Sequence, residues 1–313
     1  MYGTGTGRFS RRRPGGAGFG FAQRNSGRRG SGVLHNLLHW PAKRGQSSGA
    51  AVRSGPQLGA GQATPRGFRV TARDKAIVRW VGRLRMVTAA QVGERFGLSR
   101  AVTYARLGGL VRLGLLDHGR IFHEQPGVYL ATRSGLSIGN LELPPARIDI
   151  RTYAHDLELS SLVVQIEREF GPERVKTERE MRAADTALGS TPPIRERFAV
   201  PLSGARGQLQ LTPAGHARLH FPDCAVVSAA GEGADAVLAV ELERTAKGRA
   251  RLGRILAAYV GARHIAAVRY YTVGERVRRL VEREVAAQRA YALIDVRVWA
   301  PTHKARTQLD VAA

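Results

Sequence analysis

The segment from Thr88 to Gly114 limits the possible folds of this 313-residue chain more than any other feature. It holds two runs in which apolar residues recur at helical spacing, with Gly97 between them. Thr88 and Ser99 are favourable N-cap residues, and Gly97 stands where a left-handed residue ends a helix. Two helices joined by so short a turn form a helix-turn-helix, whose second helix reads the DNA major groove. The segment therefore predicts a DNA-binding module.

The sequence on either side of this segment predicts another helix and a pair of strands. Ala72 to Leu84 has the periodicity of an amphipathic helix. After Gly114, two strands are expected, separated by a turn at His118–Gly119, an extended stretch and a turn at Pro126–Gly127. This order resembles the winged-helix superfamily. Residues 71–143 are therefore predicted to form a winged helix-turn-helix DNA-binding domain, with a winged helix that contacts only proteins as the alternative.

The predicted DNA contacts lie on the second helix of the motif and on the hairpin. Contacts with base edges are expected from Arg100, Val102 and Tyr104. Contacts with phosphates are expected from Arg106 and Arg112, and Arg120 is expected to lie in the adjacent minor groove. The residues expected to face the core are Thr103, Leu107, Leu110 and Val111, and those expected to face away are Val102, Ala105, Arg106, Gly109 and Arg112.

The charge of the chain supports a polyanionic partner. It contains 49 Lys and Arg against 25 Asp and Glu, a formal net charge of +24. Such an excess is more than solubility needs and predicts a polyanionic partner. Together with the helix-turn-helix, it makes double-stranded DNA the expected partner. No run approaches the roughly 18 apolar residues of a membrane span, so no membrane contact is expected. One cysteine, Cys224, excludes an internal disulfide and a zinc site built from several cysteines.

Residues 1–70 differ in composition from the rest of the chain. They contain 12 Lys or Arg, 16 Gly and neither Asp nor Glu. Such a segment buries too little apolar surface to offset the entropy of ordering, so a disordered basic arm is predicted. The arm either adds phosphate contacts or is a solvated tail. It lacks the apolar segment of a signal peptide, and a cytoplasmic protein associated with the nucleoid or a plasmid is expected.

Residues 150–300 are predicted to form a second, α/β domain, and residues 301–313 a tail. The order of helices and strands is α-β-β-β-α-β-α-β, which implies a mixed sheet covered by helices. The predicted helices are Tyr153–Phe170, Lys247–Arg263 and Glu275–Arg289. The predicted strands are Arg174–Glu180, Leu219–Ser228, Ala236–Arg244, Ala266–Val273 and Ala292–Trp299. Thr186 to Ala217 is expected to be a loop or an irregular hairpin. The whole chain is thus predicted to be α+β.

Two acidic motifs on neighbouring predicted strands are the main candidates for chemistry. The element order, with Pro222-Asp223 on one strand and Glu241-Leu242-Glu243 on the next, resembles the PD-(D/E)xK (restriction-endonuclease-like) core. That resemblance implies Asp223 and Glu241 as ligands of Mg²⁺ and a water-activating Lys two residues after the Glu. Glu241 and Glu243 share a face of the strand, because alternate residues point the same way. Three carboxylates there would repel unless a divalent cation or basic groups neutralised them.

The sequence departs from that pattern where the lysine is expected. Glu243 occupies the position, and Lys247 or Arg244 is the possible substitute. Asp223, Glu241, Glu243 and Lys247 are therefore the candidate catalytic set. The alternative is a solvent-facing polar edge, with Glu241 and Glu243 paired to Arg244 or Arg249.

Two further groups of residues near these motifs have open roles. His155 and Glu158 on the helix that opens this domain are candidates for a further ligand or an orienting group, although His155 is interpreted more readily as a packing or hydrogen-bonding residue. Arg251 and Arg254 face away from the apolar side of the following helix. They are either solvated or hold a phosphate backbone.

The combination of motifs over about residues 72–273 is similar to the replication-relaxation family of bacterial plasmids and integrative elements. The matching phrases are Arg106–Leu116, Pro126–Thr132, Tyr153–Leu157, Phe221–Asp223 and Val240–Thr245. The resemblance implies a protein of mobile DNA that acts in replication, mobilisation or transcriptional control. A non-catalytic DNA-binding protein is therefore predicted. The alternatives are a metal-dependent DNA nuclease and an adaptor that recruits a relaxase or replication initiator, and the oligomeric state is open, with a dimer plausible.

Overall fold

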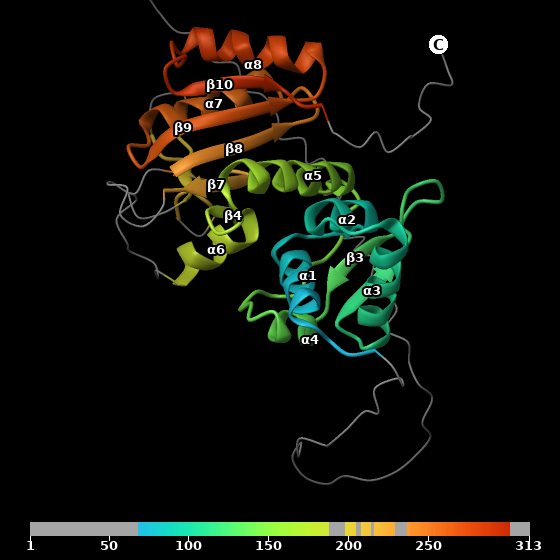
Figure 1. Cartoon of the computed structure of the whole chain (residues 1–313). Helices are drawn as coiled ribbons and strands as arrows, with labels where there is room; N and C mark the ends of the chain where they lie inside the picture. The colour runs from blue at the N-terminus through green and yellow to red at the C-terminus, as the bar shows by residue number, and fades with distance from the viewer. Residues whose placement is uncertain (1–67, 188–197, 205–207, 214–215, 229–236, 301–313) are drawn as a thin grey trace, which may run out of the picture. The chain divides into compact units, whose positions relative to one another are not determined.

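The computed structural model describes residues 68–187, 198–204, 208–213, 216–228 and 237–300. These residues form a mixed α+β structure (Figure 1). The predicted tail and nearly all of the predicted basic arm lie outside the described residues. None of the described helices is both long enough and apolar enough to cross a membrane.

The first module contains four helices and three short strands. Its helices are α1 (Ala72–Arg83), α2 (Ala89–Phe96), α3 (Arg100–Arg112) and α4 (Arg133–Ile138), and its strands are β1 (Val87–Thr88), β2 (Leu116–Gly119) and β3 (Val128–Ala131). The strands form one antiparallel sheet in the order β1-β3-β2. Helices α1, α2 and α3 lie where the sequence predicts them, and α4 directly follows β3.

Local capping explains where α2 and α3 begin and end. Thr88 and Gln91 form a reciprocal capping box at the start of α2. Gly97 ends α2 in the left-handed region, with φ of 63°. The Ser99 hydroxyl then accepts the N–H of Val102 to begin α3. These contacts produce the tight turn between α2 and α3 that the sequence predicts.

The predicted turn at His118–Gly119 is wrong. Both residues belong to β2, where His118 pairs with Tyr129 and Gly119 with Val128. The His118 ring stacks on Tyr129 at a centroid distance of 4.4 Å, which favours continued pairing. Residues 120–127 therefore form the whole connection between β2 and β3.

The inward face of α3 is mostly as predicted, with one correction. Thr103, Leu107 and Leu110 are buried. Gly109 is also buried, although the helical periodicity predicts that it faces away. The Phe68 ring lies so close over Gly109 that a Cβ atom there would overlap it. Position 109 therefore requires glycine. Phe68, the first residue that the structure describes, packs against α3.

The second module is built on a five-stranded mixed sheet in the order β10-β9-β8-β7-β4. Strands β8, β9 and β10 are parallel to one another, and β7 is antiparallel to both β8 and β4. The strands are β4 (Val175–Thr177), β7 (Cys224–Val227), β8 (Val237–Glu243), β9 (Ile265–Thr272) and β10 (Ile294–Val298). The helices are α5 (Tyr153–Phe170), α6 (Glu178–Ala187), α7 (Arg249–Gly261) and α8 (Glu275–Ala287).

Helices cover both faces of this sheet (Figure 1). Val240 and Leu242 of β8 belong to the core that includes α5. Ala239, which directly precedes Val240 and so points to the opposite face, belongs to the core that includes α7 and α8. The side chains of Glu241 and Glu243 point to the same face of the sheet as that of Ala239, because alternate residues of a strand share a face. They therefore lie on the side that α7 covers.

Two predicted strands of this module are interrupted. The strand expected over Arg174–Glu180 ends at Thr177, because Thr177 and Glu180 form a capping box that starts α6. The strand expected over Leu219–Ser228 is divided into β6 (Leu219–His220) and β7. Pro222 lies in the break and has no N–H to donate to a sheet. Strand β6 pairs instead with β5 (Val200–Pro201) in a two-stranded sheet.

A buried carboxylate links the two modules. Glu167 of α5 accepts hydrogen bonds from the Trp80 indole at 3.1 Å, from Arg83 at 2.6 Å and from Arg95. Arg83 also donates to Glu180 at 2.9 Å. Helices α1 and α2 are thus joined to α5 by charge-assisted hydrogen bonds as well as by apolar packing.

Candidate nucleic-acid interface and carboxylate cluster

The N-terminal half of α3 presents three of the predicted DNA-contacting residues to solvent. Arg100 is exposed, and the side chains of Val102 and Tyr104 retain 44% and 50% of their accessible surface. The Arg100 guanidinium lies 5.8 Å from the centre of the Tyr104 ring, within the range of a cation–π contact. This end of the helix therefore presents a guanidinium, a phenol and an apolar side chain to solvent, and guanidinium and apolar groups are among those that can contact base edges in a major groove.

Arg106 has a different role from the predicted phosphate contact. Its Nε donates to Asp74 Oδ1 at 2.9 Å, and its NH2 group pairs with the other carboxylate oxygen. Its guanidinium also lies 4.5 Å from the centre of the Phe68 ring. Burial raises the pKa of Asp74, but hydrogen bonds from Arg106 and Thr71 outweigh it and lower that pKa. Arg106 therefore joins α3 to α1, and its bidentate pairing competes with any phosphate contact.

The other two predicted contacts are exposed. Arg112 is at the C-terminal end of α3, and Arg120 directly follows β2. The connection after Arg120 is held against α5, because the Phe122 ring meets Tyr153 edge-on at 4.9 Å. Ile121 packs in the same small apolar cluster. Arg120 is thus carried on an anchored connection rather than on a free hairpin tip.

Glu241 lies in a buried network at the C-terminal end of β8. Its side chain accepts a hydrogen bond from His220 Nε2 at 2.7 Å and one from the Tyr259 hydroxyl. Burial lowers the pKa of His220, but the charge of Glu241 reverses this and raises it. The pKa of Glu241 is correspondingly lowered by His220 against the effect of burial. These opposite shifts favour a protonated His220 beside an ionised Glu241.

Asp223 lies beside β8 and pairs with a second histidine. One oxygen accepts the backbone N–H of Leu242 at 2.7 Å and lies 3.3 Å from His155 Nε2. His155 Nδ1 is 3.7 Å from Asp156. Burial would lower the pKa of His155, but hydrogen bonds and charges from Asp156 and Asp223 raise it to about 10. His155 is therefore a cation that holds Asp223, in line with its interpretation as a hydrogen-bonding residue.

Glu243 pairs with Lys247, whose Nζ lies 2.6 Å from its carboxylate. Burial and the neighbouring carboxylates raise the pKa of Glu243 even though Lys247 lowers it. Burial lowers the pKa of Lys247, but the charges of Glu241 and Glu243 raise it overall. The short distance and the two carboxylates favour the charged form of Lys247. Each of the three predicted carboxylates therefore has a cation of its own within the chain.

The alternative of a solvent-facing polar edge is wrong for Glu241 and Glu243. The two residues are only 1% and 4% exposed. The arginines expected to pair with them have other partners, because Arg244 lies 2.6 Å from Glu158 and Arg249 pairs with Glu284. The basic groups that neutralise the cluster come instead from β6, from α5 and from the segment before α7.

The cluster does not fit Mg²⁺ in this arrangement. Magnesium requires several oxygen ligands in a nearly octahedral geometry. One oxygen of Glu241, Oε1, already accepts two hydrogen bonds, and Asp223 is engaged by Leu242 and His155. Within the described part of the chain, no group of three or more His, Cys, Asp or Glu residues is placed to hold a metal ion. No metal-dependent step follows from these residues.

The two residues that donate hydrogen bonds to Glu241, His220 and Tyr259, were not predicted from the sequence. His220 stands three residues before Asp223, so it is close to a recognised motif but has no spacing that marks it. Tyr259 has the periodicity of the apolar face of α7, and it packs there. Its hydroxyl reaches Glu241 only because α7 crosses β8, which is a long-range feature.

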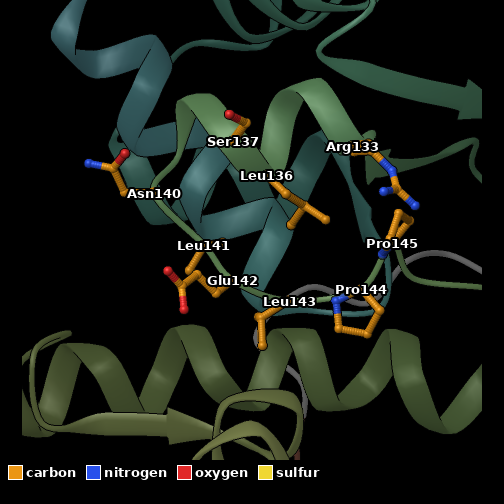
Figure 2. A pocket seen from close by; sticks show the side chains of 9 residues that line it. All are labelled: Arg133, Leu136, Ser137, Asn140, Leu141, Glu142, Leu143, Pro144 and Pro145. Atoms are coloured by element: carbon orange, nitrogen blue, oxygen red, sulfur yellow. The ribbon is translucent and has the colours of Figure 1, made fainter.

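A cavity of about 750 Å³ lies between α4 and the linker that follows it (Figure 2). Arg133, Leu136 and Ser137 form the helix side. Residues 140–145 form the linker side, and Figure 2 shows their side chains. None of the lining residues belongs to the candidate interface on α3 or to the carboxylate cluster.

Comparison with known proteins gives little similarity. No protein-family model matches the chain, and no curated protein matches it. Part of the chain is similar to a solved structure of a mutant form of ZitR from Lactococcus lactis in complex with DNA. The identity is 15%, the similarity covers 42% of this chain and 78% of that chain, and the TM-score is 0.22. A similarity of this size carries no argument about the function of this chain.

Proposed function

We propose that this chain is a non-catalytic protein that binds double-stranded DNA. In this proposal the first module is a winged helix, and the N-terminal half of α3 enters the major groove. The observation that carries the proposal is the exposure of Arg100, Val102 and Tyr104 on the second helix of a tightly capped helical pair. The net charge of +24 supplies the attraction to phosphate.

Arg100 is the residue we assign to base recognition. Its guanidinium has no carboxylate partner among the described residues, and it is oriented by the Tyr104 ring. A bidentate contact of Arg with guanine contributes roughly 1–3 kcal/mol of discrimination. Arg112 and Arg120 are assigned to phosphates or the flanking groove. Arg106 is assigned to positioning α3 on α1.

The second module is proposed to be a nuclease-like fold whose carboxylates serve stability. The order α-β-β-β-α-β-α-β is retained when α6 and the small β5-β6 sheet are set aside. Pairing of Asp223, Glu241 and Glu243 with His155, His220 and Lys247 supports a structural role. We further propose that the protein belongs with the replication-relaxation proteins of mobile DNA and acts in replication, mobilisation or transcriptional control.

The proposal is tested by DNA binding of the full chain over a salt series. Affinity for duplex DNA is expected to fall steeply with salt, because phosphate contacts release counterions. Arg100→Ala is expected to lose roughly 1–3 kcal/mol on the preferred sequence and much less on random sequence. Arg297→Ala removes the same charge from β10 and serves as the matched control. Absence of salt-dependent duplex binding, or equal losses for both variants on every sequence, would contradict the proposal.

A further inference from the structure

The outer layer of the second module, formed by α7 and α8, is unusually cationic. Residues 245–300 contain 12 Lys or Arg and only 4 Asp or Glu. Helix α7 has three arginines and no acidic residue. The two helices are in contact, since the Gln288 side chain donates to Gly253 O at 2.8 Å and Arg249 pairs with Glu284. The two adjacent helices together carry seven arginines and three glutamates, and Arg263 and Arg289 lie directly beside them.

The acidic residues of this layer are already in ion pairs. Glu275 binds both Arg278 and Arg279, at 2.7 and 2.8 Å. Glu282 binds Arg278 at 2.6 Å, and Glu284 binds Arg249. Asp295 of β10, the fourth acid of the segment, binds Arg297 at 2.7 Å. No acidic side chain of residues 245–300, all of which the structure describes, is left to neutralise a further arginine.

Six arginines on or next to these helices have no carboxylate partner among the residues that the structure describes. All are exposed except one, which is half-buried; the exposed ones are Arg251, Arg263, Arg276, Arg283 and Arg289, and the half-buried one is Arg254. Arg251 and Arg254 are three residues apart on α7 and so lie on neighbouring positions of one face. Guanidinium groups that have no carboxylate partner favour an anionic partner.

We propose that the outer face of α7 and α8 is a second DNA-contacting surface, which binds the phosphate backbone of duplex DNA without sequence preference. Guanidinium groups fit phosphate well because they donate two parallel hydrogen bonds. The proposal rests on the DNA-binding function proposed above. Glu167 joins elements of the first module to α5 of the second, so both surfaces belong to one linked structure.

The test compares salt dependence for matched double variants of the full chain. Arg251→Ala/Arg254→Ala removes two cations without a carboxylate partner from α7. Arg182→Ala/Arg297→Ala removes the same charge from exposed arginines that already bind Glu178 and Asp295. Binding to a random-sequence duplex is measured by fluorescence anisotropy across a salt series, after thermal unfolding has confirmed that each variant is folded.

The expected result is a smaller salt slope for Arg251→Ala/Arg254→Ala, by about 0.9 for each phosphate that the variant no longer neutralises, and an unchanged slope for the control. An unchanged slope in both variants overturns the second surface. So does weaker binding of the α7 variant to anionic phospholipid vesicles when its DNA binding is unaltered.

Arg100→Ala, measured in parallel, separates this inference from the proposed function. If Arg100→Ala loses sequence preference while the α7 variant keeps its slope, only the second surface is wrong. If the α7 variant has a smaller slope while Arg100→Ala changes nothing, the second surface stands and the recognition role of α3 is wrong.

Discussion

Glu167 shows how one residue can determine the arrangement of several elements. It is buried, and its carboxylate accepts hydrogen bonds from Trp80, Arg83 and Arg95. An ionised carboxylate in such a place depends on these donors, and the largely buried Arg83 depends in turn on the carboxylate. The connection between the two modules is therefore sensitive to a single side chain.

Glu167→Ala is expected to lower the free energy of unfolding by on the order of 3 kcal/mol, because it leaves Arg83 with one fewer carboxylate in a buried site. Chemical denaturation measures the change. Glu169→Ala is the control, since Glu169 is on the same helix and pairs with Arg269 at an exposed site, where a decrease of at most about 1 kcal/mol is expected. Equal decreases for the two variants would show that Glu167 does not hold the modules together.

His155 gives the fold a dependence on pH. Its pKa is raised from 6.5 to about 10 by Asp156 and Asp223, after burial has acted in the opposite direction. A pKa that is raised on folding adds stability that is complete below about pH 6.5 and is lost as the pH rises through about 10. His155→Gln is expected to reduce stability at neutral pH and to flatten the decline above it. Parallel curves of unfolding free energy against pH for the two proteins would refute this role.

Some residue roles were predictable from the sequence and others were not. The outward position of Val102 and Arg112 follows from helical periodicity alone, whereas the same periodicity places Arg100 and Tyr104 only at the edge of that face. The pairing of Arg106 with Asp74 does not follow from periodicity, because the two residues are 32 positions apart and meet only when α1 packs on α3. Periodicity predicts which residues share a face of a helix, but it does not predict which other element packs against that face.

At the scale of helices and strands, local signals were the most informative. Thr88, Gly97 and Ser99 mark the ends of α2 and α3 because capping depends on residues within one turn. The strand predicted over Arg174–Glu180 was too long, because a capping box at Thr177, which is also a local signal, starts α6 there. The irregular hairpin expected as one alternative for Thr186 to Ala217 covers β5, but its pairing with β6 was missed because Leu219 and His220 were assigned to the strand that contains β7.

Gly97→Ala tests the turn between α2 and α3. Nothing lies within 4 Å of a Cβ atom at this position, so the cost comes only from the left-handed backbone with φ of 63°. The expected decrease in unfolding free energy is about 1 kcal/mol. Gly108→Ala on α3 is the control, since its Cβ would be 3.6 Å from Arg112 in ordinary contact, and alanine favours a helix. A decrease in unfolding free energy for Gly97→Ala that is no larger than the change for Gly108→Ala would contradict this assignment.

For the whole molecule, the carboxylate cluster decides between a binding protein and a nuclease. Supercoiled plasmid incubated with the full chain and Mg²⁺ or Mn²⁺ is expected to remain intact, because the cations of His155, His220 and Lys247 occupy the positions around the carboxylates. Gel electrophoresis measures nicking, and an Asp223→Ala preparation controls for contaminating nucleases. Nicking by the unaltered protein that the Asp223→Ala variant lacks would restore the nuclease alternative.

The order of eight elements of the second module was predictable because each has its own periodicity, whereas α6 and the pairing of β5 with β6 were not predicted. The internal ion pairs of the module were not predictable, since they join α5, β6, β8 and the segment before α7. The same limit applies to the cationic layer of α7 and α8. Its charge can be counted from the sequence, but only the structure shows that the nearby acids are already paired.

The central claim is that Arg100 on α3 reads bases in duplex DNA. The most direct measurement is selection of bound sequences from a random duplex library by the unaltered chain and by Arg100→Ala in parallel. The unaltered chain is expected to enrich a motif, and the variant to lose discrimination at one or two guanine positions while it retains the rest. An identical motif from both proteins, or no motif from either, would contradict the claim.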